Sequence, residues 1–154
     1  MKKEQINRIC AGGLLAALYI VTTAINPIGY GIIQLRISAI ISIIPFFREE
    51  YKFPCIAAVA IANIFSPLGF IDVLVGVTLW SIAYYGISKL TRNIYARCGL
   101  TAILSGLLVG SELSYTLHVP FLFNFASVTV SQGIVFSIGI VILQYLNKVF
   151  SHKK

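Results

Sequence analysis

Charge is scarce in this chain of 154 residues: charged residues make up 11% of it, whereas 58% of its residues are hydrophobic. A soluble domain of ordinary composition carries roughly 25% charged residues, because water has to solvate its surface. The mean hydropathy of +0.89 is correspondingly high. We therefore expect an integral membrane protein rather than a water-soluble one, with residues 1–154 forming a single membrane domain.

Acidic residues are rarer than basic ones, five against twelve, which gives a net charge of +7. A basic chain can bind nucleic acid, but these positive charges gather at the ends of apolar segments instead of forming a basic stripe, so nucleic acid is not an expected partner. Cysteines are also few, and Cys10, Cys55 and Cys98 form no CxxC pair. No metal site is expected from them. Unmodified thiols are the simplest interpretation, and reversible palmitoylation is the alternative.

Motifs of catalysis and nucleotide binding are missing as well. The chain has no GxxxxGK loop for a nucleoside triphosphate, no HExxH helix and no GxSxG nucleophile turn. We therefore expect no enzyme, and no cofactor in this chain. A membrane transport protein without an ATPase site needs an ion gradient or a partner protein as its source of energy.

What the sequence does contain is a series of apolar segments. A helix needs about 20 apolar residues to cross a bilayer, and segments that approach this length predict an all-α integral membrane bundle of six transmembrane helices. They lie at residues 8–25, 31–47, 53–67, 70–89, 98–117 and 124–147. The first segment resembles a secretory signal, but its apolar run is long and has no clean small-x-small cleavage site. We expect it to be retained.

The basic residues orient this bundle. If the N-terminus is cytoplasmic, the cytoplasmic parts are the two ends of the chain and the gaps at 48–52 and 89–97. These parts hold eleven of the twelve basic residues, whereas the three outer loops hold none, as the positive-inside rule requires. We predict a multi-pass protein of the bacterial plasma membrane with cytoplasmic N- and C-termini. Arg36 is the one cation that this topology does not explain.

Other polar residues share the predicted depth of Arg36, near the outer ends of their helices: Gln34, Asn63, Asp72, Glu112, His118 and Asn124. Ionisable groups buried in a membrane pair with one another or line a water-accessible cavity. We therefore predict an outward-facing pocket for one small molecule. Its expected substrate-binding residues are Gln34, Arg36, Asn63, Asp72 and Glu112.

Several of these residues also have a purely structural interpretation. Asp72 is placed to cap the fourth predicted helix, where a carboxylate is favoured, and Asn124 is placed to cap the sixth. His118 suits a solvated loop. Arg36 is able to close a salt bridge with Asp72 or Glu112 that needs no ligand.

Small residues recur at consecutive registers of the first segment. Gly12 lies four positions before Ala16, and Gly13 lies four positions before Ala17. Such small-xxx-small pairs let another helix approach closely. Packing inside the bundle and docking of a partner membrane protein are both compatible with them.

The stretches "GIIQLRIS", "IPFF", "IANIFSPLGFIDVLVG" and "GSELSYTLHVPFLFNFASVTV" resemble the QueT family of membrane proteins in order and spacing. The resemblance covers nearly the whole chain, and its most specific parts are a Q-x-R-x-S and an N-x-x-S-P-x-G-x-x-D pattern. It implies a six-helix S component of an energy-coupling-factor (ECF) transporter, with queuosine precursors of the 7-deazaguanine type as cargo. The implied partners are a membrane T subunit and two cytoplasmic ATPase subunits that use ATP. The T subunit would dock on Gly12, Gly13, Ala16 and Ala17.

A 7-deazaguanine also suits the predicted pocket chemically. Its pyrimidine edge presents two neighbouring N–H donors that one carboxylate can accept. Glu112 is the first choice for this carboxylate, because Asp72 has the competing capping role. Ala39 and Gln132 stand where the family usually has glutamate, which favours a neutral cargo such as the nitrile form over a precursor with an aminomethyl cation.

Two other functions remain compatible with these residues. The first is a stand-alone proton-coupled secondary transporter of a nucleobase-like or vitamin-like solute, with Asp72 or Glu112 as the proton carrier. The second is a structural membrane protein whose polar cluster is a salt-bridged core.

Overall fold

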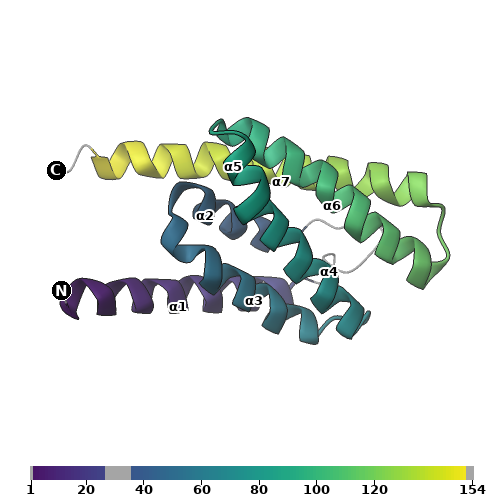
Figure 1. Ribbon diagram of the computed structural model, residues 1–154, viewed down its shortest axis with the longest axis horizontal. Coiled ribbons are helices and arrows are strands. Elements are labelled where there is room, and N and C mark those ends of the chain that lie inside the picture. Colours follow the sequence, from purple (N-terminus) through teal and green to yellow (C-terminus); the bar gives the residue numbers. More distant parts are fainter. Residues whose placement is uncertain (1, 27–35, 152–154) are drawn as a thin grey trace.

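The computed structural model describes residues 2–26 and 36–151, and every regular element in these two ranges is a helix (Figure 1). The first half contains a long helix, two 3-10 segments and two shorter α-helices. These are α1 (Lys2–Ala24), η2 (Ile37–Ile43), α2 (Ile44–Phe47), η3 (Glu49–Tyr51) and α3 (Lys52–Ile64). The second half contains a helix with a π-helical middle, followed by a long hairpin. Its elements are α4 (Phe70–Ser81), η4 (Ile82–Ile87), α5 (Ser88–Leu90), α6 (Ile94–Leu117) and α7 (Phe121–Ser151).

Four stretches of the described residues are long and apolar enough to cross a membrane. They are Lys3–Ala24, Phe70–Leu90, Ile94–Leu117 and Phe121–Tyr145. These four correspond to the predicted segments 8–25, 70–89, 98–117 and 124–147. The sequence therefore predicted the all-helical class and these four candidate spans correctly.

The other two predicted segments form shorter helices. α3 has 13 residues and is about 20 Å long, against about 30 Å of hydrocarbon in a bilayer. It ends at Ile64, before the predicted boundary at residue 67, because a tight turn follows. The described part of the segment 31–47 is the apolar helix Ile37–Phe47, and residues 31–35 lie outside the described ranges. Neither helix is long enough to span a bilayer by itself.

Large apolar side chains cover the outside of the molecule. On α1, Leu14 and Leu18 are exposed while Leu15 and Tyr19 are buried, and α7 likewise exposes Ile134 and Ile138. Soluble monomers rarely expose contiguous apolar surface of this extent. Lipid chains solvate such a surface without penalty, and the helices satisfy their own backbone groups. The surface is that of a membrane protein.

An aromatic cluster forms the middle of the core. The ring of Trp80 lies 5.2 Å from that of Tyr84 and 6.2 Å from that of Phe136, and Phe46 meets Tyr84 edge-on at 5.4 Å. The hydroxyl of Tyr84 donates to the backbone carbonyl of Ser42 at 2.8 Å. These contacts join η2, α2, α4, η4 and α7 into one packed interior.

The connections between helices lie at two opposite ends of the bundle (Figure 1). The start of α1, the end of α7 and the junctions α2–α3 and α5–α6 lie toward one end, and the junctions α3–α4 and α6–α7 lie toward the other. The first end, here called the basic end, carries Arg48, Lys52, Lys89 and Arg97. We call the opposite end the polar-site end. This arrangement agrees with the grouping that the charge pattern predicted.

Candidate functional site

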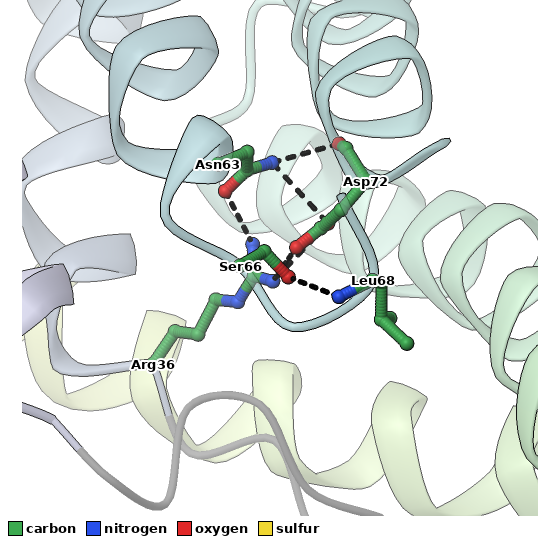
Figure 2. A network of polar contacts seen from close by, with 5 residues as sticks. All are labelled: Arg36, Asn63, Ser66, Leu68 and Asp72. Atoms are coloured by element: carbon green, nitrogen blue, oxygen red, sulfur yellow. Dashed lines mark hydrogen bonds and ion pairs between the residues drawn. The ribbon is translucent and has the colours of Figure 1, made fainter. Parts of the chain in front are cut away.

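Arg36 lies immediately before η2 and is buried, with 8% of its surface exposed. Its guanidinium reaches the start of α4. Nη2 donates to both carboxylate oxygens of Asp72, at 3.3 and 3.2 Å, and Nη1 donates to Oδ1 of Asn63 at 3.5 Å (Figure 2). Asp72 is more deeply buried than Arg36. The structure thus contains the Arg36–Asp72 salt bridge, which was one of the structural interpretations of Arg36 from the sequence.

Asn63 completes this set, which we call the Arg36 network (Arg36, Asn63 and Asp72). Its Nδ2 donates to the backbone carbonyl of Asp72 at 2.8 Å and to the carboxylate Oδ1 at 3.2 Å (Figure 2). The N-cap of α4 is Gly69, and no side-chain hydrogen bond caps the helix there. Asp72 is therefore not the N-cap residue, but it lies in the first turn of α4, where the helix N-terminus favours a negative charge.

The turn between α3 and α4 brings Asn63 and Asp72 together. The amide of Ser66 donates to the carbonyl of Asn63 at 3.1 Å. The Ser66 hydroxyl accepts from the amide of Leu68 at 3.2 Å (Figure 2). Gly69 starts α4 with a φ of 66°, a left-handed conformation that glycine adopts without steric cost. The S-P-x-G stretch of the sequence pattern is therefore the device that reverses the chain between these two residues.

Gly76, one turn beyond Asp72, leaves the space that Asn63 occupies. A Cβ at this position would collide with Nδ2 of Asn63 and would approach Val59 to 2.9 Å. Close packing of α4 on α3 therefore depends on this glycine. Its missing side chain leaves room for the Asn63 carboxamide beside Asp72.

Glu112 lies on α6 and is buried, with 4% of its surface exposed. Neither of its carboxylate oxygens accepts a hydrogen bond from any residue in the described ranges. The carboxylate is near enough to Arg36 and Asp72 to feel the charges of both. Because an unpaired carboxylate is costly in a membrane interior, Glu112 is the residue of this cluster that most needs a partner.

Two carboxamides on α7 behave in the same way. Asn124 is fully buried and Gln132 nearly so, and the side-chain oxygen of each accepts no hydrogen bond within the described residues. α7 begins at Phe121, so Asn124 lies inside its first turn and does not cap it. The capping interpretation of Asn124 is wrong. Its polarity at the predicted outer depth was the signal that could have added it to the site.

The remaining residues singled out in the sequence lie outside the Arg36 network or outside the described ranges. Gln34 falls outside the described residues. His118 is exposed and ends α6 in the left-handed conformation, with a φ of 55°, so the interpretation as a loop residue is the one the structure favours. Ala39 is buried in the apolar core. The structure thus brings together Arg36, Asn63 and Asp72, with Glu112 close by.

The small residues of α1 face two directions. Gly12 is buried against α3, where an added Cβ would lie 3.0 Å from Pro54, and Ala16 packs against the core. Gly13 and Ala17 are exposed, and an added Cβ at Gly13 would meet nothing within 4 Å. One pair therefore serves packing within the chain, and the other lies open on the surface of α1.

A helical bundle with an apolar outer surface and a buried polar cluster at one end is typical of a membrane transport protein. Residues 9–148 match the QueT transporter family, and the chain belongs to this family. It is also 25% identical over 165 aligned positions to the "Queuosine precursor transporter QueT" of Lactococcus lactis subsp. cremoris (strain MG1363), with 96% of each chain covered. No solved structure matches the chain. The family resemblance seen in the sequence is confirmed.

Proposed function

We propose that this transporter is the substrate-binding S component of an ECF-type importer for a queuosine precursor of the 7-deazaguanine type. Support for the cargo comes from the family and from the name of the Lactococcus lactis relative. The observation that carries the assignment of a binding site is Glu112, a buried carboxylate without a hydrogen-bond donor among the described residues, beside the Arg36 network. A bound heterocycle with N–H groups would supply that donor.

In this proposal the chain is a single domain in the bacterial plasma membrane. Both termini are cytoplasmic, and the polar-site end faces outward. The concentration of basic residues at the opposite end supports this orientation. The helix Ile37–Phe47 and α3 would complete six membrane-embedded helices, with the shorter ones covered by their longer neighbours. The residues that form the substrate site, by contacting the substrate or by positioning the helices around it, would include Arg36, Asn63, Asp72 and Glu112, together with Gln34.

The energy would come from partners: a membrane T subunit and two cytoplasmic ATPase subunits. The exposed pair Gly13 and Ala17 supports a docking surface on α1, because a flat strip of small residues admits a second helix at short distance. Leucine at both positions is expected to abolish co-purification with the T subunit and leave ligand binding unchanged. Leu18→Phe, on an adjoining exposed face of α1, is the matched control. If the wild type, the double leucine variant and Leu18→Phe co-purify equally with the T subunit, α1 is not part of the docking surface.

Calorimetry with the purified protein in lipid nanodiscs tests the cargo. The nitrile and aminomethyl forms of 7-deazaguanine, guanine and thiamine would be titrated separately. We expect at least one 7-deazaguanine to bind with a Kd of about 1 µM or tighter and thiamine not to bind. Absence of binding by both 7-deazaguanines would contradict the proposed cargo.

Glu112, which accepts no hydrogen bond within the described residues, also supports a second candidate, a proton-coupled transporter that works alone. A buried carboxylate without a hydrogen-bond donor is a suitable carrier for a proton. Uptake of labelled precursor by cells that lack the partner ATPases separates the two proposals. Loss of uptake supports the S component, and uptake that persists and stops when the proton gradient is collapsed supports the secondary transporter.

A further inference from the structure

The buried polar cluster contains two groups of side chains with different hydrogen bonding. In the Arg36 network, guanidinium donors meet the carboxylate of Asp72 and the carbonyl of Asn63, and the Asn63 amide meets Asp72. Donors and acceptors are therefore matched within the protein. Breaking these bonds to bind a ligand would leave a charge without its counterion in a membrane interior, which is strongly unfavourable.

The second group lies on the α6–α7 hairpin and consists of acceptors. Both carboxylate oxygens of Glu112 and Oδ1 of Asn124 receive no hydrogen bond from the described residues. The Asn124 amide, in contrast, donates to the carbonyl of Val119 at 3.4 Å. Buried acceptors are almost always satisfied in folded proteins. A molecule that brings N–H donors would satisfy them.

The packing of α6 on α7 places these acceptors at the same depth. A Cβ on Gly110 would lie 3.1 Å from the amide nitrogen of Phe125 and 3.5 Å from the carbonyl carbon of Asn124. Asn124 is therefore level with Gly110, and Glu112 lies two positions beyond, a rise of about 3 Å along the helix. Gly106 maintains this close approach, because a Cβ there would lie 2.9 Å from the Phe125 carbonyl.

We propose that Glu112 and Asn124 are the side chains that contact the transported molecule, and that the Arg36 network positions the surrounding helices without contacting its hydrogen-bonding edge. This inference rests on the proposed function in that the cluster is taken to be the transport site. Glu112 accepts two neighbouring N–H groups, and Asn124 accepts a third. The site therefore selects neutral or cationic molecules rich in N–H donors and rejects anions, because Arg36 is already paired with Asp72.

Calorimetry with two 7-deazapurines tests this assignment. One probe carries the 2-amino-4-oxo edge of guanine, and the other is its analogue without the 2-amino group. We expect the wild-type protein to prefer the amino-bearing probe by about 10- to 100-fold, the range for a hydrogen bond to a charged group. Glu112→Gln is expected to weaken binding of this probe by a similar factor and to reduce the preference to a few-fold.

Asn124→Leu is expected to weaken binding of the same probe by about tenfold. Two matched controls, Ser111→Ala beside Glu112 on the exposed side of α6 and Gln144→Leu on α7, are expected to bind like the wild type. Thermal unfolding without ligand provides a second readout. Glu112→Gln removes no hydrogen bond that the described residues make, so its melting temperature should equal or exceed that of the wild type, whereas a structural role would lower it.

The outcomes separate this inference from the proposed cargo. If the wild type binds a 7-deazaguanine and Glu112→Gln and Asn124→Leu bind it equally well, the contact assignment is overturned and the cargo stands. If another N–H-rich heterocycle binds in a Glu112-dependent way and no 7-deazaguanine does, the contact assignment stands and the cargo is wrong. If no probe binds, both are overturned.

Discussion

Two arginines, one at each end of the bundle, satisfy their guanidinium groups in different ways. At the basic end, Arg97 donates to three backbone carbonyls, those of Thr91 at 2.7 Å, Phe46 at 2.9 Å and Ser88 at 3.0 Å. At the polar-site end, Arg36 donates to the side chains of Asp72 and Asn63. Backbone carbonyls are fixed by the helices that carry them, whereas side chains change partners by rotating.

The two ends also differ in how completely their buried polar groups are hydrogen-bonded. Arg97 satisfies the carbonyls at the ends of α2 and α5, which would otherwise lack donors, and so joins three helical segments. The polar-site end satisfies its charges pairwise but leaves the acceptors of Glu112 and Asn124 without donors in the described residues. One end is closed by contacts within the chain, whereas the other keeps buried acceptors that have no donor within the described residues, as expected if a ligand binds there.

The largest loss of stability is expected from Asp72→Ala, which removes the carboxylate that pairs with Arg36 at the polar-site end. Asp72→Ala leaves Arg36 buried without its carboxylate, and breaking one side of a buried ion pair costs about 3–5 kcal/mol. Arg36→Met combined with Asp72→Ala removes both charges and should recover at least half of the lost stability. Thermal unfolding of the ligand-free protein in detergent measures both. If the double variant is no more stable than Asp72→Ala, the loss of stability does not come from leaving the charge of Arg36 unpaired.

Arg97→Met removes the corresponding guanidinium at the basic end. Three carbonyls lose their donor, but they lie close to a helix junction where water can replace part of it, so we expect a loss of about 2–3 kcal/mol. Ligand affinity measured by calorimetry should stay within about twofold, because the site is at the opposite end. Arg92→Met, at an exposed arginine of the same junction, is the control and should cost less than about 0.5 kcal/mol. A large loss of affinity in Arg97→Met would contradict the separation of the two ends.

The sequence was sufficient to predict what depends on position along a helix. Hydropathy placed four candidate spans, and the placement of basic residues separated the two ends. It also named Asp72 as a partner of Arg36, because opposite charges buried in a membrane have to pair. It did not distinguish Asp72 from Glu112. That distinction depends on the turn at Ser66–Gly69, which faces Asp72 toward Asn63 and Arg36.

Rotation of each helix about its axis was not predictable in the same way. Gly12 and Gly13 are neighbours in sequence, yet about 100° of helical rotation turns one toward α3 and the other outward. The length of α3 was overestimated for a related reason: residues 65–67, which the predicted segment 53–67 included, belong to the turn that follows Ile64. Hydropathy indicates which residues lie within the membrane, but it does not indicate where a helix ends.

Gly76→Ala tests how the Arg36 network is supported, and we expect a smaller loss of about 1–2 kcal/mol. The added methyl group collides with Asn63 and Val59, and overpacking of this kind typically costs 1–3 kcal/mol, offset in part by the better helix propensity of alanine. Gly13→Ala has the same propensity gain without a contact within 4 Å. It should therefore be neutral or slightly stabilising in thermal unfolding. Equal effects of the two substitutions would show that the close packing at Gly76 is relaxed easily.

The smallest effect is expected from Gln132→Glu, which adds an acid at a buried position of α7, about 12 Å along the helix from Asn124. The buried cluster contains two carboxylates, Asp72 and Glu112, and one guanidinium, so a further negative charge in the same poorly solvated interior should favour a cationic cargo. We expect the affinity ratio of the aminomethyl form over the nitrile form of 7-deazaguanine to rise by about fivefold, on the order of 1 kcal/mol. Gln144→Glu, an exposed position on the same helix, should leave the ratio unchanged. If calorimetry gives the same ratio for Gln132→Glu and the wild type, the charge of residue 132 does not reach the ligand, and cargo preference rests on Glu112 and Asn124.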